Sequence, residues 1–287
     1  MSGFKKSIAI FGPGLMGGSL LLALRQRSPQ LSLRVWGRRE SALESLQEAN
    51  LANFCSTDAA AVAKGAEAIV LCVPVDKLAE VARLAVPGVS PDCLVTDVGS
   101  VKSTVVAELG EIFSSQGNFV GSHPMCGSET TGWEAARADL YEGAWCVITP
   151  TPETRPNMVE AAKNLWTSLG AQVREMSPSE HDRAAALISH VPHVAAAALV
   201  EILAGENPSW QSLCAGGFRD TTRVASGSPE LWTAILSHNR VETARALGVL
   251  VRLLQSIQKS LEIDKMDQIA QFLEAAQSRR NHIMEDI

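Results

Sequence analysis

A glycine-rich turn near the N-terminus restricts the fold of this chain more than any other stretch. Residues 7–12, SIAIFG, form a short apolar, β-branched run that is typical of a buried strand. The run leads into Gly12-Pro-Gly14-Leu-Met-Gly17, a G-x-G-x-x-G pattern, and GSLLLALRQR follows with helical composition. In such a turn Gly12 allows the tight bend, Gly14 lets a diphosphate approach the backbone, and Gly17 lets the helix pack against the strand. Because a helix N-terminus also offers free amide groups, the sequence predicts a dinucleotide-binding site.

The end of the second predicted strand indicates which dinucleotide is bound. NAD-binding chains usually carry Asp or Glu about 20 residues after the glycines, where the carboxylate binds the ribose hydroxyls. Residues 31–40, LSLRVWGRRE, place Gly37, Arg38 and Arg39 there instead. Arginine grips a phosphate with two parallel hydrogen bonds, so we expect NADP rather than NAD, although two arginines could also simply cap a surface strand. The residues expected to bind the cofactor are Gly12, Gly14, Leu15, Met16, Gly17, Gly37, Arg38, Arg39, Val73 and Pro74.

The first half of the chain alternates between strand-like and helix-like segments. Further strands are expected at 66–74, 93–100, 118–124 and 144–150, and helices at 40–50, 77–85 and 102–115. This alternation predicts an α/β fold with a doubly wound, mostly parallel sheet. Ligands of such sheets bind beyond the carboxyl ends of the strands. The loops VPVD, VGSVK and GSHPMCG all follow strands, so His123 is expected to face the cofactor cleft.

The second half is expected to be helical, which divides the chain into residues 1–176, a dinucleotide-binding domain, and residues 177–287, a substrate and dimerisation domain. A long helix is predicted over 177–205, with Ser177 or Ser179 as N-cap, Gly205 at its end and a kink at Pro192. Further helices are predicted at about 209–217, 228–237, 239–258 and 262–280. The last two are too apolar on one face to stand alone, which suggests packing against another subunit.

Net charge, hydropathy and cysteine spacing argue against several classes of protein. A net charge of −6 gives no support for a nucleic-acid or anionic-membrane binder. The apolar run at the start is broken by glycines, and no other stretch approaches the roughly 20 unbroken apolar residues of a membrane helix. The six cysteines are scattered without a C-x-x-C pair, so neither a zinc framework nor a disulfide scaffold is expected, and reduced thiols in a cytoplasmic protein are the simplest interpretation.

Three motifs of the second half carry candidate site residues. SHVPHV places His190 and His193 three positions apart, but no third metal ligand is near in sequence, and no metal is expected. GGFRDTTRVA carries Arg219 and Arg223 behind a double glycine; these are surface ion pairs or, on a glycine-rich turn, a carboxylate-binding site. SPELW starts a helix and supplies Trp232.

Taken together, the motifs GPGLMGGS, DVGSVK, GSHPMCGSE, SHVPHV, GGFRDTTR and SPELW resemble the prephenate and arogenate dehydrogenase family of tyrosine biosynthesis. They occur in that order between residue 12 and about residue 232. The first motif is shared with many dehydrogenases, whereas the histidine loop, the SHVPH helix and the GGF-x-D-x-T-R segment are specific. The resemblance implies hydride transfer from ring C4 of a cyclohexadiene to NADP, with loss of carbon dioxide.

The resemblance also assigns roles to particular residues. It makes His123 the base that takes the proton of the C4 hydroxyl, with Ser100 bonded to the same hydroxyl. It makes Arg223 the bidentate partner of the side-chain carboxylate. The other residues it implies around the substrate are Asp220, which would orient the arginine, His193 and Ser189, which would line the pocket, Glu129 at the pocket mouth, and Trp232 as an aromatic wall, from this subunit or its partner.

Some alternatives stay open on the sequence alone. A β-hydroxyacid dehydrogenase would need a lysine on the long helix, where ISHVPHVAAAALVE has none, and a pyrroline-carboxylate reductase would lack the histidine loop. A non-catalytic NADP-binding redox sensor would not need His123, Ser100 and Arg223 together. Prephenate and arogenate differ only in a keto or amino group; Thr130 and Thr131 are neutral, which leans towards prephenate, although Glu129 could favour the ammonium of arogenate. Fused mutase and regulatory domains are not expected, so tyrosine would act as a competitive inhibitor at the active site.

Overall fold

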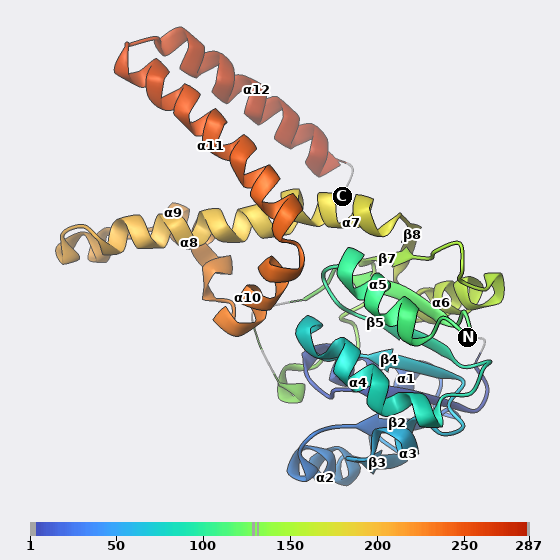
Figure 1. Cartoon of the computed structure of the whole chain (residues 1–287). Helices are drawn as coiled ribbons and strands as arrows, with labels where there is room; N and C mark the ends of the chain where they lie inside the picture. The colour runs from blue at the N-terminus through green and yellow to red at the C-terminus, as the bar shows by residue number, and fades with distance from the viewer. Residues whose placement is uncertain (1–3, 128–129, 131, 286–287) are drawn as a thin grey trace. The chain divides into compact units, whose positions relative to one another are not determined.

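A computed structural model describes residues 4–127, 130 and 132–285. It contains an eight-stranded sheet (Figure 1). The strand order is β3-β2-β1-β4-β5-β6-β7-β8. The first six strands in this order repeat the arrangement typical of dinucleotide-binding sheets, which confirms the predicted doubly wound α/β fold. The strands are β1 Ser7–Phe11, β2 Ser32–Trp36, β3 Phe54–Ser56, β4 Ala68–Leu71, β5 Leu94–Asp97, β6 Phe119–Pro124, β7 Trp145–Thr149 and β8 Gln172–Glu175.

Helices cover both faces of the sheet. On one face pack α1 Leu15–Arg27, α2 Glu40–Glu48 and α6 Pro156–Ser168; on the other pack α3 Ala59–Ala63, α4 Leu78–Ala85 and α5 Ser103–Ile112. In β1, Ile8 and Ile10 face the first layer, whereas Ala9 and Phe11 face the second. Burial on both sides explains why this strand is a continuous apolar run rather than an alternating one.

The structure adds elements that the sequence pattern did not predict. The strands β3 and β8 end the sheet at its two edges, and their side chains are half-buried or exposed. Edge strands of three or four partly exposed residues carry too weak an apolar pattern to stand out. The helix α3 has only five residues, and α6, which connects β7 to β8, was also not predicted.

One strand reverses direction. β7 pairs antiparallel with β6, with His123 opposite Val147, whereas β5 and β6 are parallel. Between β6 and β7 the described residues contain a 3-10 helix, Trp133–Ala135, and no α-helix. A parallel neighbour usually needs a helical crossover, so the chain returns here in the antiparallel direction. The α6 crossover then places β8 parallel to β7.

The predicted long helix is present but has a wider turn in its middle. It consists of α7 Pro178–Ala185, a π-helical turn Ala186–His190, and α8 Val191–Ala204, with Gly205 as C-cap. Ser177 is the N-cap, because its hydroxyl accepts a hydrogen bond from the Glu180 amide at 3.2 Å. Pro192 has no N–H to give to the preceding turn, so the expected irregularity takes the form of the π turn just before it.

The next two predictions of local structure were wrong. Residues 209–217 are not one helix: a 3-10 helix covers Pro208–Leu213, and α9 covers Gly216–Thr222. The double glycine is therefore the first turn of a helix rather than a glycine-rich turn, since Ala215 serves as N-cap and the remaining residues tolerate helical geometry. A 3-10 turn, Arg223–Ser226, and the helix α10 Pro229–His238 follow.

One helix reaches the length and mean hydropathy of a membrane span, although it is not an unbroken run of about 20 apolar residues. Within the described part of the chain, the run Pro178–Ala204 is long and apolar enough by length and composition, with a mean hydropathy of 1.6, and 28% of its most apolar window is buried. The run is not unbroken, because Ser189, His190 and His193 interrupt it. Two of these residues, His190 and His193, are buried within the protein.

The chain forms two compact units, Met1–Arg240 and Val241–Ile287. The second unit consists of most of α11 Arg240–Glu262 and of α12 Met266–Glu285, which are joined by a short turn into a helical hairpin (Figure 1). Many of its apolar side chains are exposed, among them Leu254, Leu261 and Leu273. This matches the expectation that these helices are too apolar on one face to stand alone.

Candidate active site

Four strand ends meet at one edge of the sheet. The strands β1, β4, β5 and β6 are parallel neighbours, so the loops that follow them lie on the same side. The glycine turn follows β1, Val73 and Pro74 follow β4, and Ser100 follows β5. His123 is the fifth of the six residues of β6. The predicted cofactor loop and the predicted base therefore share the carboxyl edge of the sheet.

The glycine turn has the shape that a dinucleotide diphosphate needs. Gly12 has φ +100°, and a Cβ there would lie 2.7 Å from the Cys72 carbonyl oxygen. A Cβ on Gly17 would collide with the Gly12 carbonyl, whereas a Cβ on Gly14 would meet no atom of the described chain within 4 Å. The helix α1 begins after Gly14 with neither a side-chain cap nor an acidic residue in its first turn. Its first amide groups are therefore available to an anion.

The groups that would contact the ribose lie beside this turn. Gly37 is buried after β2, and a Cβ on it would lie 3.0 Å from the Leu43 side chain. Arg38 and Arg39 follow it and are exposed. Because β1 and β2 are paired, the ends of both strands lie at the same edge as the glycine turn. Two guanidinium groups rather than a carboxylate stand at this position.

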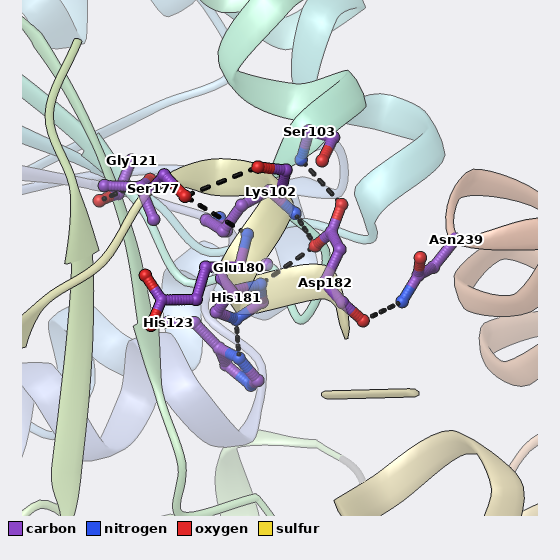
Figure 2. A network of polar contacts seen from close by, with 12 residues as sticks. Lys102, Ser103, Gly121, His123, Ser177, Glu180, His181, Asp182 and Asn239 are labelled. Carbon is purple, nitrogen blue, oxygen red and sulfur yellow. Dashed lines mark hydrogen bonds and ion pairs between the residues drawn. The ribbon is translucent and has the colours of Figure 1, made fainter. Parts of the chain in front are cut away.

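His123 is held by a second histidine (Figure 2). Its Nδ1 lies 2.8 Å from Nε2 of His181, and the two rings meet edge to face with centroids 5.1 Å apart. His181 belongs to the first turn of α7 and is 2% exposed. Its Nδ1 lies 2.9 Å from Oδ1 of Asp182. A carboxylate and two imidazoles are thus joined by a chain of hydrogen bonds at the carboxyl edge of the sheet.

Asp182 is in turn fixed from several sides. Its Oδ1 accepts a hydrogen bond from the Lys102 amide at 2.7 Å, and its Oδ2 accepts one from the Ser103 amide at 2.8 Å. Its backbone carbonyl accepts a bond from the Asn239 side chain at 2.8 Å, which Figure 2 shows. Although burial raises the pKa of Asp182, hydrogen bonds from His181 and Ser103 lower it below its usual value. Asp182 is therefore a carboxylate.

A buried ion pair lies directly beneath this group. Lys102 and Asp97 are both fully buried, and Nζ of Lys102 bonds Oδ2 of Asp97. Nζ also donates to the Ser122 carbonyl at 2.9 Å, and Asp97 accepts from the amides of Gly99 and Ser122 at 2.8 and 3.0 Å. These bonds tie the end of β5 to the end of β6. They fix the loop that carries Ser100 next to the strand that carries His123.

The surroundings keep His123 neutral. Burial lowers its pKa well below the usual value, and the neighbouring His181 and Lys102 lower it further, against the opposite effect of Asp182. A neutral imidazole can accept a proton, whereas a protonated one cannot. Among the described residues, none forms a hydrogen bond with its Nε2. His123 is thus a histidine in the base form with one free nitrogen at the ligand edge of the sheet.

A second cluster forms around Trp232 of α10. Its ring stacks on His193 of α8, with centroids 3.5 Å apart and planes 12° apart, and His190 meets it edge-on at 6.2 Å. Trp232 and Ile235 also pack against the layer of the sheet that contains Val75, which follows β4. The tryptophan therefore reaches the predicted pocket residue His193 within one subunit. Among the described residues, no group of three potential metal ligands surrounds His190 and His193.

The remaining predicted site residues have these positions. Ser100 is half-buried in the loop after β5, and Ser189 is half-buried in the π turn. Arg223 begins the 3-10 turn that packs against α8, and its side chain is exposed, as is that of Asp220 on α9. The structure brings His193 and Trp232 together, and among the described residues no hydrogen bond or ring contact joins them to Ser100, Ser189 or Asp220. Glu129 and Thr131 lie outside the described residues.

Sequence motifs did not predict the residues behind His123, namely Asp97, Lys102, His181, Asp182 and Asn239. A charged residue inside an apolar strand, Asp97, was the one visible signal. Lys102 lies in the motif DVGSVK, but its position in that motif does not indicate that its side chain is buried. His181 and Asp182 look like ordinary polar residues in the first turn of a helix, and only the docking of α7 on the sheet edge gives them a role.

Comparison with known proteins agrees with this geometry. Residues 20–175 match the model of the prephenate dehydrogenase nucleotide-binding domain, and residues 177–275 match that of the prephenate dehydrogenase dimerization domain. A prephenate dehydrogenase of Bacillus subtilis (strain 168) is 35% identical over 98% of this chain and 77% of its own length.

Two solved structures are similar over nearly the whole chain. Prephenate dehydrogenase from A. aeolicus, in complex with hydroxyphenyl propionate and NAD+, has a TM-score of 0.92 and 28% identity, covering 99% of this chain and 100% of its own. Synechocystis arogenate dehydrogenase has a TM-score of 0.83 and 30% identity, covering 96% and 99%. The glycine turn, the histidine at the sheet edge and these matches together show that the chain belongs to the prephenate dehydrogenase family and is an NAD(P)-dependent oxidoreductase.

Proposed function

We propose that this enzyme oxidises and decarboxylates prephenate, L-arogenate or both, with NADP as its preferred cofactor. Prephenate gives 4-hydroxyphenylpyruvate, and arogenate gives L-tyrosine. The observation that carries the proposal is His123, a neutral histidine with free Nε2 at the edge of the sheet that also holds the glycine turn. A cofactor-dependent oxidation of an alcohol needs one base at this place.

The reaction asks His123 to hold a proton and return it. The nicotinamide, when bound, supplies the acceptor for the hydride that leaves ring C4. As that hydride leaves, the C4 hydroxyl gives its proton to Nε2 of His123 and a C4 carbonyl forms. The bond from C1 to the carboxylate then breaks, its electron pair moves through the ring to the C4 oxygen, and that oxygen takes the proton back as a phenol. The reaction releases no net proton, so His123 needs only to hold the proton of the C4 hydroxyl and return it to the C4 oxygen.

Other groups would position the substrate. We propose that Ser100 bonds the C4 hydroxyl from the β5 loop and that Arg223 binds the side-chain carboxylate, aided by Asp220. The stacked rings of His193 and Trp232 offer a flat wall for the cyclohexadiene ring. Ser189 and Glu129 complete the proposed set. The A. aeolicus relative is bound to hydroxyphenyl propionate, which carries the phenol and carboxylate of the proposed products.

The choice between the two acids depends on which protein groups contact the side chain of the substrate. Arogenate carries an ammonium group where prephenate carries a keto group. The exposed Thr130 is neutral, which favours prephenate, whereas a carboxylate from Glu129 would favour arogenate. We propose prephenate as the main substrate, with arogenate accepted. Relatives of both kinds support keeping both acids in the proposal.

Initial rates of reduced-cofactor formation test the function. We expect turnover with prephenate in the presence of NADP, a lower rate with arogenate, and lower rates with NAD than with NADP for both acids. Faster turnover with arogenate would reverse the substrate order. Tight NADPH binding without turnover of either acid would instead favour a non-catalytic NADP-binding sensor. The other alternative, a β-hydroxyacid dehydrogenase, would need a lysine on the long helix, and this chain has none in ISHVPHVAAAALVE.

Replacement of Arg38 by alanine tests the cofactor preference. Arg38 is exposed after β2, where it would grip a 2′-phosphate. Loss of one charge-assisted pair of hydrogen bonds costs about 1.5–3 kcal/mol, so Arg38→Ala is expected to lower kcat/KM for NADP roughly 10- to 100-fold and to leave NAD unchanged. The matched control is Arg83→Ala, an exposed arginine of α4. Equal losses with NADP and NAD would contradict the role of Arg38. Both cofactors are compared because the A. aeolicus relative is bound to NAD+.

We further propose a homodimer formed through the region 177–287, which would serve as substrate and dimerisation domain beside the dinucleotide-binding domain 1–176. Exposed apolar side chains such as Leu187, Ile188 and Ile202 on the long helix, and Leu254 and Leu273 on the hairpin, support burial in an interface. All six cysteines are free thiols, which suits the cytoplasm. Tyrosine, which shares the phenol and carboxylate of the products, would inhibit by competition.

A further inference from the structure

We infer that His181 and Asp182 act as a fixed acceptor pair behind His123: they direct the single proton of neutral His123 to Nδ1, leave Nε2 as the base atom, and share the proton taken from the substrate. This inference rests on the proposed role of His123 in the reaction. His181 and Asp182 are themselves almost fully buried. They are positioning residues that act through His123.

For two uncharged imidazoles, the chain of hydrogen bonds from Asp182 through His181 to His123 leaves one arrangement of protons. Asp182 is a carboxylate and can only accept, so Nδ1 of His181, 2.9 Å away, carries a proton. With that single proton, His181 has a bare Nε2, which faces Nδ1 of His123 at 2.8 Å. Two bare nitrogens would repel each other, so Nδ1 of His123 carries its proton. Nε2 of His123 is therefore bare and basic. The opposite arrangement would place a bare nitrogen of His181 against the Asp182 carboxylate.

The carboxylate that starts this line has no freedom to turn. One oxygen is held by the Lys102 amide and the other by the Ser103 amide, both on the chain that leads into α5. His181 and Asp182 are each 2% exposed, so water does not compete for these bonds. Asn239 additionally holds the Asp182 carbonyl. The orientation of His123 is thus set by the docking of α7 against the start of α5.

The same line offers a place for the proton taken from substrate. When Nε2 of His123 gains that proton, the proton on Nδ1 can move 2.8 Å along the hydrogen bond to Nε2 of His181. His181 becomes an imidazolium beside the Asp182 carboxylate, and His123 is neutral again. The positive charge then lies one ring further from the cleft. The reverse movement returns the proton to the C4 oxygen when carbon dioxide leaves.

The other charged and titratable groups near His123 are compatible with this line. Lys102 and His190 face the same region and, like burial and His181, lower the pKa of His123, whereas Asp182 raises it. The charge of Lys102 is paired with Asp97. The thiol of Cys146, on the paired strand β7, bonds the backbone of His123, and burial raises its pKa well above the usual value, so it stays uncharged. His123 and His181 are thus the pair within this group that can exchange a proton.

Nitrogen-15 NMR of the histidine side chains tests the tautomer directly, without substrate. The chain has six histidines, and the His123 signals are assigned by their loss in His123→Asn. We expect a protonated Nδ1 and a bare Nε2 for His123 near neutral pH. In His181→Leu, which removes the acceptor, we expect a mixture of both tautomers. In His181→Gln, whose amide oxygen can still accept from His123, we expect the parent tautomer.

Kinetics of the same variants test the functional part, with prephenate and NADP as the probe. His181→Leu is expected to lose kcat on the order of 10- to 100-fold at unchanged KM, the range typical of a group that orients a functional histidine. His181→Gln should recover part of that loss. In both variants the acid limb of kcat/KM should move to higher pH, because His181, which lowers the pKa of His123, is gone. His282→Gln, an exposed histidine of α12, is the matched control and should behave like the parent.

The outcomes separate this inference from the function on which it rests. A protonated Nε2 on His123 in the parent enzyme overturns the tautomer assignment, whatever the activity. Turnover of His181→Leu at the parent rate and pH dependence overturns the positioning role. Equal losses of kcat in the Leu and Gln variants without a tautomer change would mean a purely structural histidine. If the parent shows the expected tautomer but turns over neither acid, the arrangement of protons on His123 and His181 is confirmed and the proposed reaction is wrong.

Discussion

His123→Asn is expected to lower kcat with prephenate about 10²- to 10⁴-fold while the affinity for NADPH stays that of the parent, since a positioned base contributes that much to a rate. Asparagine places an amide where the histidine has Nδ1, so it can still donate to His181 and preserve the contact that His123 makes at 2.8 Å. What it lacks is a nitrogen at the position of Nε2. The variant therefore removes the base and keeps its support. Initial rates and a fluorescence titration with NADPH measure the two effects.

The pH dependence of the same variant gives a second measurement. Burial and the neighbouring His181 and Lys102 hold the pKa of His123 well below 6.5, so the parent should lose kcat/KM only as the pH falls beneath that value, when the histidine becomes protonated. The residual rate of His123→Asn should lack this acid limb. His282→Asn, on the exposed side of α12, serves as control. A variant at position 123 with parent turnover would show that another group takes the proton.

Lys102→Met is expected to give the largest loss of stability. Lys102 and Asp97 are fully buried, and methionine removes the cation while leaving the Asp97 carboxylate in the interior with two amide donors. Removing one partner of a buried ion pair costs about 3–5 kcal/mol, so the free energy of unfolding should fall by that amount. Urea denaturation followed by circular dichroism measures the shift of the midpoint.

Two further variants test whether the loss of stability comes from the unpaired charge of Asp97. The double variant Asp97→Asn, Lys102→Met removes both charges and should recover a large part of the lost stability, because no unpaired charge remains in the interior. Lys163→Met is the matched control: Lys163 pairs with Glu160 and Glu175 on the surface, at 2.9 and 2.7 Å, and its loss should leave the midpoint unchanged. A midpoint of Lys102→Met equal to the parent's would mean that the interior neutralises Asp97 without this lysine.

Much of the fold could be predicted because short stretches of sequence determine it. The buried strand β1 is apolar on both faces, the three glycines fit one turn, and Ser177 and Gly205 end the long helix where capping preferences place them. Each of these features depends on a few consecutive residues. The wrong predictions lie where local patterns compete: the double glycine of GGFRDTTR suggested a turn, but Ala215 caps a helix there. The edge strands β3 and β8 were missed because their half-exposed side chains carry no clear period.

The sequence by itself determined that a dinucleotide cradle follows β1 and that His123 lies at the end of a strand, because short-range stereochemistry decides both. Only the tertiary structure decided which groups support that histidine. His181 is 58 residues away from His123, the Lys102 amide is 80 residues away from Asp182, and Asn239 is 57 residues beyond Asp182. Such contacts depend on how α7 is rotated and docked against the sheet edge. Periodicity places a side chain on a face of a helix, but the partner it meets there is set by long-range packing.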